Sequence, residues 1–304
     1  MRRPVATPLI LAGILLLASC AGVNPHYDAT RAHHRPDGFV NSDSARAIGT
    51  LPWYAIMWRR LRGDFRPLAP PAGGYDQFAA QWSAPIDLAQ LRTPARQARI
   101  TWLGHASLLL QVAGRNILID PQLSDYAGPL RLLSAARRVP APLRPEDLPP
   151  IDFVLISHNH YDHLDEPTIR RLVAAGQRPH FLVPLGVKRW FADLGIDRVR
   201  EMDWWDELTD GPLRIRFTPA QHWSKRTPFD TNRTLWGGFA VENGDPATPW
   251  RFLYTGDTGY SADFREIRRR WAPWTCWPFR SAPTCRATSW PPSTPTPTMP
   301  YASC

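Results

Sequence analysis

Short apolar runs rich in branched side chains divide the middle of the chain into predicted strands. Three such runs lie at residues 99–103, 107–112 and 115–120, and Ala113-Gly114 is expected to form a hairpin turn between the last two. Further strands are predicted at residues 151–156, 180–184, 213–218, 235–241 and 250–254. The run at 151–156 is nearly unbroken, which is typical of a strand buried on both faces.

Segments between these strands show the spacing of amphipathic helices. Residues 166–175 have helical spacing of apolar side chains, with Asp165 as a plausible N-cap and Pro167 in the first turn. Residues 187–194 predict a second, shorter helix that ends at Gly195. Strands that alternate with helices indicate an α/β protein built in layers.

A group of imidazoles and carboxylates follows the strand predicted at residues 151–156. The stretch reads Ser157-His158-Asn159-His160-Tyr161-Asp162-His163-Leu164-Asp165. The end of a buried strand is a rigid position from which side chains can be directed at one point. Neutral imidazole suits zinc, and a carboxylate can hold a second ion nearby. The alternative is a polar surface turn that happens to be rich in histidine.

The spacing His158-x-His160-x-Asp162-His163 resembles the signature of the metallo-β-lactamase superfamily. This resemblance implies an α/β fold, namely an αββα sandwich with one or two metal ions at one edge. Three further stretches are similar to the branch of N-acylphosphatidylethanolamine-hydrolysing phospholipases D. They are Thr101-Trp102-Leu103-Gly104-His105-Ala106-Ser107, Gln221-His222-Trp223-Ser224-Lys225-Arg226 and Tyr254-Thr255-Gly256-Asp257-Thr258-Gly259-Tyr260. The motifs together indicate a hydrolase domain at residues 99–270.

The resemblance also implies a set of metal ligands. The first Zn²⁺ would be held by His158, His160 and His222, the second by Asp162 and His163, and Asp257 would bridge the two ions. Asp162 and Asp257 are therefore the expected catalytic carboxylates. We expect two zinc ions per chain. The second site is short of one ligand, because the final histidine of the resembling families has no counterpart in this chain.

Residues beside these motifs are candidates for supporting roles. Asp120, at the end of the strand predicted at 115–120, either supports the metal site from behind or simply ends the strand. His105 either contacts substrate phosphate or has a structural role. Lys225 and Arg226 are candidate phosphate-binding residues, with solvated surface charges as the alternative.

The implied activity is that of a zinc-dependent phosphodiesterase of the phospholipase D type. Two metal ions can deprotonate a shared water and neutralise charge that develops on phosphorus. The hydroxide would attack in line and expel the N-acylethanolamine, which leaves phosphatidate. Two alternatives stay open: another hydrolase of the same fold, such as a sugar-phosphate lactonase, or a membrane-anchored protein with a decayed, inactive site.

The first residues have the features of a bacterial export signal. Met1-Arg2-Arg3 is basic, residues 9–18 are apolar but too few to span a bilayer comfortably, and Leu17-Ala18-Ser19-Cys20 resembles a lipobox. We therefore expect residues 1–20 to be a lipoprotein signal peptide with Cys20 as the lipidated residue; an ordinary secretory signal or a membrane anchor is the alternative. A lipid anchor would hold the protein on a membrane of the bacterial cell envelope, facing the periplasm and beside a phospholipid substrate.

Residues 21–98 are predicted to form an extension that packs on the core. A short helix is expected at residues 53–60, and its aromatic side chains either pack on the core or contact lipid headgroups. His26, His33 and His34 lie in a polar context with no strand to fix them, so we expect them to be exposed.

The composition changes abruptly at residues 271–304. This stretch is rich in Pro, Trp and Thr, has no histidine or acidic residue, and shows no helical or strand period. The resembling families continue instead with an apolar strand and a metal-binding histidine, so we expect the sandwich to lack its last strand and helix. Codons read one base out of phase permit such a continuation, which favours a frameshift near residues 271–274 over a natural low-complexity tail. On this view Cys276, Cys285 and Cys304 are not a disulfide set.

Composition is compatible with a folded enzyme that acts at a lipid surface. Hydrophobic residues make up 43% of the 304 residues, which is enough for a buried core. The formal net charge of +9 suits an anionic membrane surface or a phosphate-bearing substrate. The basic residues are dispersed and form no run interleaved with aromatic residues, so nucleic-acid binding is not expected. The sequence identifies no protein partner.

Overall fold

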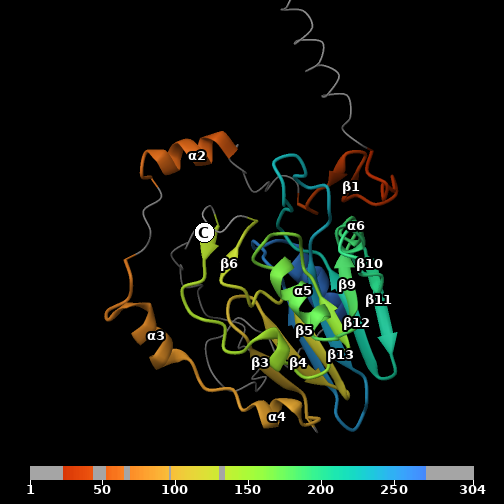
Figure 1. Ribbon diagram of the computed structural model, residues 1–304. Helices are drawn as coiled ribbons and strands as arrows, with labels where there is room; N and C mark the ends of the chain where they lie inside the picture. The colour runs from red at the N-terminus through yellow and green to blue at the C-terminus, as the bar shows by residue number, and fades with distance from the viewer. Residues whose placement is uncertain (1–22, 44–52, 65–68, 96, 130–133, 272–304) are drawn as a thin grey trace, which may run out of the picture.

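Two β-sheets packed face to face form the centre of the protein, here a computed structural model, with helices on their outer faces (Figure 1). The structure describes residues 23–43, 53–64, 69–95, 97–129 and 134–271.

The larger sheet has six strands in the order β10-β9-β8-β5-β4-β3. Its strands are β3 (Arg99–Trp102), β4 (Leu108–Val112), β5 (Arg115–Ile119), β8 (Phe153–Leu155), β9 (His180–Pro184) and β10 (Val199–Met202). The first three pair antiparallel, whereas β5, β8, β9 and β10 pair in parallel. Ala113 and Gly114 both have positive φ, 52° and 70°, as the predicted two-residue hairpin turn requires.

The smaller sheet has four strands, all antiparallel, in the order β11-β12-β13-β14. They are β11 (Glu207–Asp210), β12 (Leu213–Thr218), β13 (Gly238–Asn243) and β14 (Trp250–Tyr254). In β12, Leu213, Ile215 and Phe217 are fully buried, while Arg214 and Arg216 between them are not. This alternation turns one face of the strand toward the larger sheet.

The core lies between the two sheets and under the helices that cover them. The residues between the sheets include Leu110, Ile117, Ile119 and Leu155 from the larger sheet and Ile215, Phe217, Phe239 and Val241 from the smaller. Helices α5 (Glu166–Ala174) and α6 (Lys188–Ala192) pack on the outer face of the larger sheet. Helix α7 (Asp263–Trp271) packs on the smaller sheet through Ile267 and Trp271. This order of layers confirms the predicted αββα sandwich.

The chain before β3 adds three helices to one side of the sandwich. Helices α2 (Trp53–Leu61), α3 (Gly74–Trp82) and α4 (Leu88–Arg92) form an arch, drawn in orange in Figure 1. Ahead of them, β1 (His34–Arg35) and β2 (Gly38–Phe39) pair with each other. The long connection from β5 to β8 contains β6 (Tyr126–Ala127), β7 (Ala135–Ala136) and the short 3-10 helix η2 (Pro145–Asp147).

The elements β10, β11 and α7 are not among those predicted from the sequence. The two strands lie at sheet edges and are 4 residues long each, so they bury few side chains. Helix α7 is dominated by charged residues and buries Asp263, Ile267 and Trp271. Elements with so few apolar side chains are stabilised mainly by the surrounding fold and not by their own sequence.

Two predictions concern parts of the chain outside the described residues. Residues 1–20, with the lipid anchor at Cys20, lie outside them, and so do residues 272–304 with the proposed frameshift and the missing last strand and helix. These stay predictions. Among the helices of the described ranges, none has the length and apolar character to cross a bilayer.

We expect Phe217→Ala to lower the free energy of unfolding by about 3–5 kcal/mol, because it leaves a cavity between the sheets. The Phe217 side chain is 0% exposed, and its ring centre lies 5.0 Å from that of Phe239. Phe229 is 90% exposed and provides the matched control, since Phe229→Ala should change stability by less than about 0.5 kcal/mol. Urea denaturation measures both variants, and equal losses would contradict the assigned core.

Candidate metal centre

Three imidazole rings converge beyond the ends of β8 and β12. Nε2 of His158 lies 2.8 Å from Nδ1 of His160, and Nε2 of His222 lies 3.2 Å from each of these two nitrogens. Neutral imidazoles have one proton each to share, so three converging nitrogens cannot all be satisfied by one another. A cation among them would accept all three lone pairs.

Strands of both sheets deliver the site residues. His158 follows β8 of the larger sheet, whereas His222 follows β12 and Asp257 follows β14 of the smaller sheet. Before Asp257 the backbone turns at Gly256, which has a φ of 60°, and a Cβ atom there would lie 2.5 Å from the carbonyl oxygen of Gly237. Only glycine fits this turn without displacing the chain. The site therefore depends on the packing of the two sheets against each other.

A buried carboxylate, Asp120, orients two of the imidazoles. Its Oδ2 accepts hydrogen bonds from Nδ1 of His163 at 2.7 Å and from the hydroxyl of Ser157 at 2.5 Å. Because that hydroxyl donates to Asp120, it accepts from Nδ1 of His158, 2.8 Å away. Both rings therefore keep a proton on Nδ1 and direct Nε2 toward the site. This geometry favours the supporting role of Asp120 over that of a residue that only ends β5.

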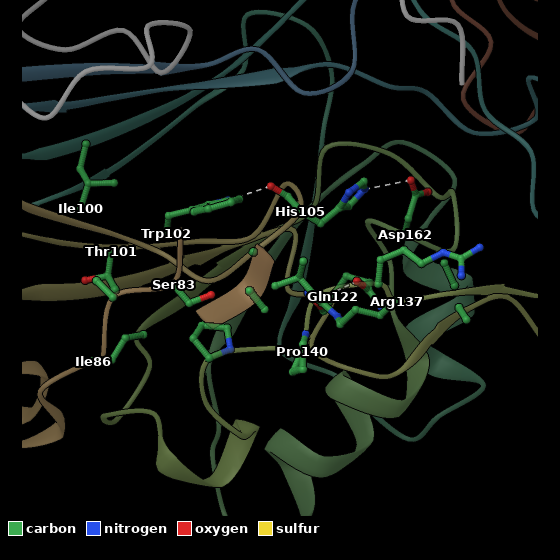
Figure 2. A pocket seen from close by; sticks show the side chains of 18 of the residues that line it. Ser83, Ile86, Ile100, Thr101, Trp102, His105, Gln122, Arg137, Pro140 and Asp162 are labelled. Atoms are coloured by element: carbon green, nitrogen blue, oxygen red, sulfur yellow. Dashed lines mark hydrogen bonds and ion pairs between the residues drawn. The ribbon is translucent and has the colours of Figure 1, made fainter. Parts of the chain in front are cut away.

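A second group of candidate ligands surrounds Nε2 of His163. This nitrogen is buried and has no hydrogen-bond partner among the described residues. A carboxylate oxygen of Asp257 lies 3.4 Å from it, and one of Asp162 lies 3.8 Å from it. Nε2 of His105 lies 3.0 Å from the same Asp162 oxygen (Figure 2). His105 thus holds a candidate metal ligand in place from the side of the adjacent pocket.

Burial keeps the three converging imidazoles neutral. It is the main reason that the pKa of His158 lies well below its usual range, and it lowers the pKa of His160 to about 4 and that of His222 to about 3. Neutral imidazole is the form that binds a metal. For His163, burial alone would lower the pKa, but the Asp120 carboxylate outweighs burial and raises this pKa well above its usual range.

The two carboxylates of the site stay ionised. Burial would raise the pKa of Asp162, but a hydrogen bond from His105 and the charge of His163 outweigh it and lower this pKa. Burial of Asp257 is likewise outweighed, here by the neighbouring His163 side chain, so its pKa is also lowered. Ionised carboxylates beside imidazoles make a mixed nitrogen and oxygen ligand set that suits zinc.

The structure brings together all the residues that the sequence predicts as metal ligands. They are His158, His160, Asp162, His163, His222 and Asp257. In a tetrahedral zinc site with Zn–N bonds of about 2.0–2.1 Å, ligand nitrogens lie about 3.3 Å apart. The separations of 2.8 and 3.2 Å among the three imidazole nitrogens are close to this value. The buried, unpartnered Nε2 of His163 fits a second cation between the carboxylates.

The adjacent basic residues occupy different environments. The guanidinium of Arg226 donates to the carbonyl oxygens of Asn159 at 3.1 Å and Leu164 at 2.8 Å, and it lies 4.1 Å from the ring centre of Tyr161. These contacts favour a structural role for Arg226, bracing the ligand-bearing loop, over the predicted contact with phosphate. Lys225 differs because it lines the pocket beside the site.

A cavity of about 1330 Å³ opens beside the candidate ligands. Next to the metal centre it is lined by His105, His160, Asp162 and Lys225. Its apolar lining includes Phe78, Ile86, Leu91, Ile100, Trp102 and Val139. Ile86 and Ile100 lie on the side of the pocket away from Asp162 (Figure 2). An apolar volume of this size suits a substrate that carries hydrocarbon chains.

The expectation that His33 and His34 are exposed is wrong, because both rings are buried against Asp203. Their Nε2 atoms lie 2.7 and 3.0 Å from the two carboxylate oxygens, and Arg31 lies 3.2 Å from one of these oxygens. The backbone N–H of Asp28 donates to Nδ1 of His34, so the ring proton of His34 sits on Nε2 and points at Asp203. The group therefore forms a hydrogen-bonded anchor between this segment and Asp203. Its carboxylate lies 170 residues beyond His33, which no local pattern reveals.

The sequence pattern does not reveal the residues that orient the ligands. Ser157 and Tyr254 carry no strong ligating group, yet Ser157 links His158 to Asp120 and the hydroxyl of Tyr254 donates to Asp120 at 2.6 Å. The available signal is position, since Ser157 directly precedes the first ligand and Tyr254 opens the stretch that contains Asp257.

We expect Asp120→Asn to weaken zinc binding by about 10–100-fold, the range for loss of a residue that orients a metal ligand. The carboxylate oxygens of Asp120 both accept hydrogen bonds, and an amide would turn an N–H₂ group toward one set of these donors. Zinc content after dialysis against a competing chelator, measured by mass spectrometry, checks this.

Asp152→Asn is the matched control for this change. The Asp152 carboxylate accepts from the backbone N–H of Asn116 at 2.8 Å. Asp152 lies directly before β8, at the opposite end of that strand from His158. An amide oxygen can still accept this bond, so zinc binding should match the wild type. Full zinc retention in Asp120→Asn, or equal zinc loss in both variants, would refute the orienting role.

Comparisons with known proteins agree with this geometry. A family model described as "Beta-lactamase superfamily domain" matches residues 115–282. An uncharacterized protein of Mycobacterium tuberculosis is 36% identical over 284 residues, which cover 88% of this chain and 71% of that protein. The N-acyl-phosphatidylethanolamine-hydrolyzing phospholipase D 1 of Caenorhabditis elegans is 35% identical over 183 residues, 57% of this chain and 50% of that protein. A UPF0173 metal-dependent hydrolase of Aeropyrum pernix is 28% identical, over 58% of this chain and 68% of that protein.

With an αββα sandwich, converging ligands and a family match over more than half of its length, the chain belongs to the metallo-β-lactamase superfamily.

Proposed function

We propose that this protein is a zinc-dependent phosphodiesterase of the phospholipase D type that acts on N-acylphosphatidylethanolamine-like phospholipids. The observation that carries the proposal is the largely apolar cavity of about 1330 Å³ that opens beside His160 and Asp162. A lipid with long acyl chains can bury them there while its phosphate lies beside the metal ligands. A small sugar phosphate has no apolar part to fill such a volume.

At the level of reaction class the chain is a metal-dependent hydrolase, in keeping with its family and with relatives such as the Aeropyrum pernix hydrolase. Beyond this reaction class, we propose a lipid substrate. It is supported by the name of the Caenorhabditis elegans relative, of which the match covers 50%. It is further supported by the position of Lys225 on the cavity wall beside the ligands.

The residues of the site would have different roles in phosphodiester hydrolysis. With metal ions bound, the site would supply an activated water and positive charge to neutralise the phosphoryl group. Lys225 can place its ammonium group beside the phosphate, and His105 holds Asp162 through their 3.0 Å hydrogen bond. The oxygen of water joins phosphorus, the bond from phosphorus to the ethanolamine oxygen breaks, and that oxygen leaves with a proton as N-acylethanolamine.

Hydrolysis by the wild-type protein tests the proposal. Vesicles that contain N-acylphosphatidylethanolamine should release N-acylethanolamine and phosphatidate, detected by mass spectrometry, and a chelator should abolish the release. Turnover confined to soluble lactones would favour a lactonase of the same fold instead. Zinc well below one ion per chain would favour a decayed site.

We expect Lys225→Ala to reduce kcat/KM for the phospholipid by about 10–100-fold, because a charge-assisted hydrogen bond to phosphate contributes about 1.5–3 kcal/mol. Zinc content should not change, since Lys225 is not a ligand. Lys188→Ala is the matched control, because Lys188 lies exposed in α6, away from the cavity lining. Equal activity of the two variants would rule out phosphate binding by Lys225.

We also propose that lipidation of Cys20 holds the protein on a membrane of the cell envelope, close to its lipid substrate. The lipobox-like stretch before Cys20 supports this. Membrane fractionation of a bacterial host should find the wild type in the membrane pellet and Cys20→Ser in the soluble fraction. Unchanged distribution of Cys20→Ser would exclude the lipid anchor.

A further inference from the structure

The side-chain amide of Asn41 pairs with the backbone of His222. Nδ2 of Asn41 donates to the carbonyl oxygen of His222, and Oδ1 accepts from the backbone N–H of His222, both at 2.9 Å. Oδ1 also accepts from Nε1 of Trp236 at 3.1 Å. A neighbouring strand would make the same two-point pairing, although Asn41 lies 181 residues before His222 in the sequence.

His222 needs such a partner because it lies beyond the end of β12. Backbone groups outside a strand ladder must find other partners, and loop backbone that lacks them opens easily. The preceding residue, Gln221, is held by the N–H of Gly259, which donates to its carbonyl oxygen at 2.8 Å. Asn41 holds the next residue along, so the backbone is fixed at the point from which the imidazole of His222 projects.

Asn41 is the last residue of a segment, residues 24–41, that we call the N-terminal clamp. Two histidines of this clamp bond to Asp203, as described above. Phe39 is buried in the core between the sheets, and its backbone N–H donates to the carbonyl oxygen of Asn232 at 2.9 Å. The clamp is therefore attached to the sandwich at separate points, which lets it fix the position of a single amide.

We propose that Asn41 is a positioning residue of the metal centre. It fixes the backbone of His222 so that Nε2 of this ring meets the nitrogens of His158 and His160. Asn41 lies well before residues 115–282, which match the family domain, so a segment outside that domain completes the site. The proposal rests on the metal ligands assigned above and not on the identity of the substrate.

Cobalt(II) titration of the full chain, followed by visible absorption, tests this proposal. We expect Asn41→Ala to weaken the binding step at the three imidazoles by about 10–100-fold, the range for loss of a residue that orients a ligand. The absorption band of that step should also change, because the ligand geometry is altered. The step at Asp162 and His163 should stay at the wild-type affinity.

Asn243→Ala is the matched control. Nδ2 of Asn243 donates to the carbonyl oxygen of Thr248 at 2.8 Å and to its hydroxyl at 3.0 Å, at the end of β13 and outside the clamp. This variant should lose a similar number of hydrogen bonds and some thermal stability, yet bind cobalt as the wild type does. The comparison separates a role in positioning His222 from a role in general stability.

Unchanged cobalt binding in Asn41→Ala, equal weakening of both binding steps, or the same loss in Asn243→Ala would overturn the proposal. Should Asn41→Ala fail to fold, Asn41→Asp takes its place, because it keeps the acceptor for the His222 N–H and replaces the donor by a carboxylate oxygen that the His222 carbonyl repels. The same selective weakening is expected for it. A wild-type protein that binds no cobalt would instead refute the ligand assignment, whatever the substrate.

Discussion

The buried charge of Asp120 is the constraint on which the metal centre depends. An ionised carboxylate away from water is costly unless it is fully hydrogen-bonded. Here it accepts from the backbone and hydroxyl of Ser157, from His163 and from Tyr254. These donors come from the exits of β8 and β14, so the carboxylate joins the two sheets where the ligands leave them. The same bonds decide which nitrogen of His158 and of His163 faces the site.

Outside the strands, side chains take over the role of the strand ladders. Arg226 bonds to the carbonyl oxygens of Asn159 and Leu164, which lie on either side of the His160-to-His163 stretch. The hydroxyl of Tyr161 donates back to the carbonyl oxygen of Arg226 at 2.8 Å. These hydrogen bonds thereby hold the segment that carries His222 against the loop that carries the other imidazoles. Irregular backbone of this kind can hold ligands accurately only because such bonds replace regular pairing.

Much of the fold and the ligand set could be predicted because their signals are local. The strands with continuous or alternating apolar residues, such as β9, β12 and β14, were predicted within a residue of their observed ends. The candidate ligands follow from the family resemblance of short motifs, and each of these motifs lies in one loop or after a predicted strand. The burial of His33 and His34 and the contacts of Arg226 cannot be predicted, for the opposite reason. Their partners are distant in sequence or are backbone carbonyls, and neither kind of partner can be recognised from the residues next to them in the sequence.

The division of the site between parts of the chain explains how one fold can serve many substrates. All the candidate metal ligands lie inside residues 115–282, the part that matches the family domain. The apolar wall formed by Phe78, Ile86 and Leu91 lies before it, on α3, α4 and the segment between them. The candidate ligands thus belong to the shared sandwich, with Asn41 supporting one of them from outside the family domain, while the added helices contribute part of the apolar wall of the cavity. Substrate choice can then change by changing these helices, without disturbing the hydrogen bonds that orient the imidazoles.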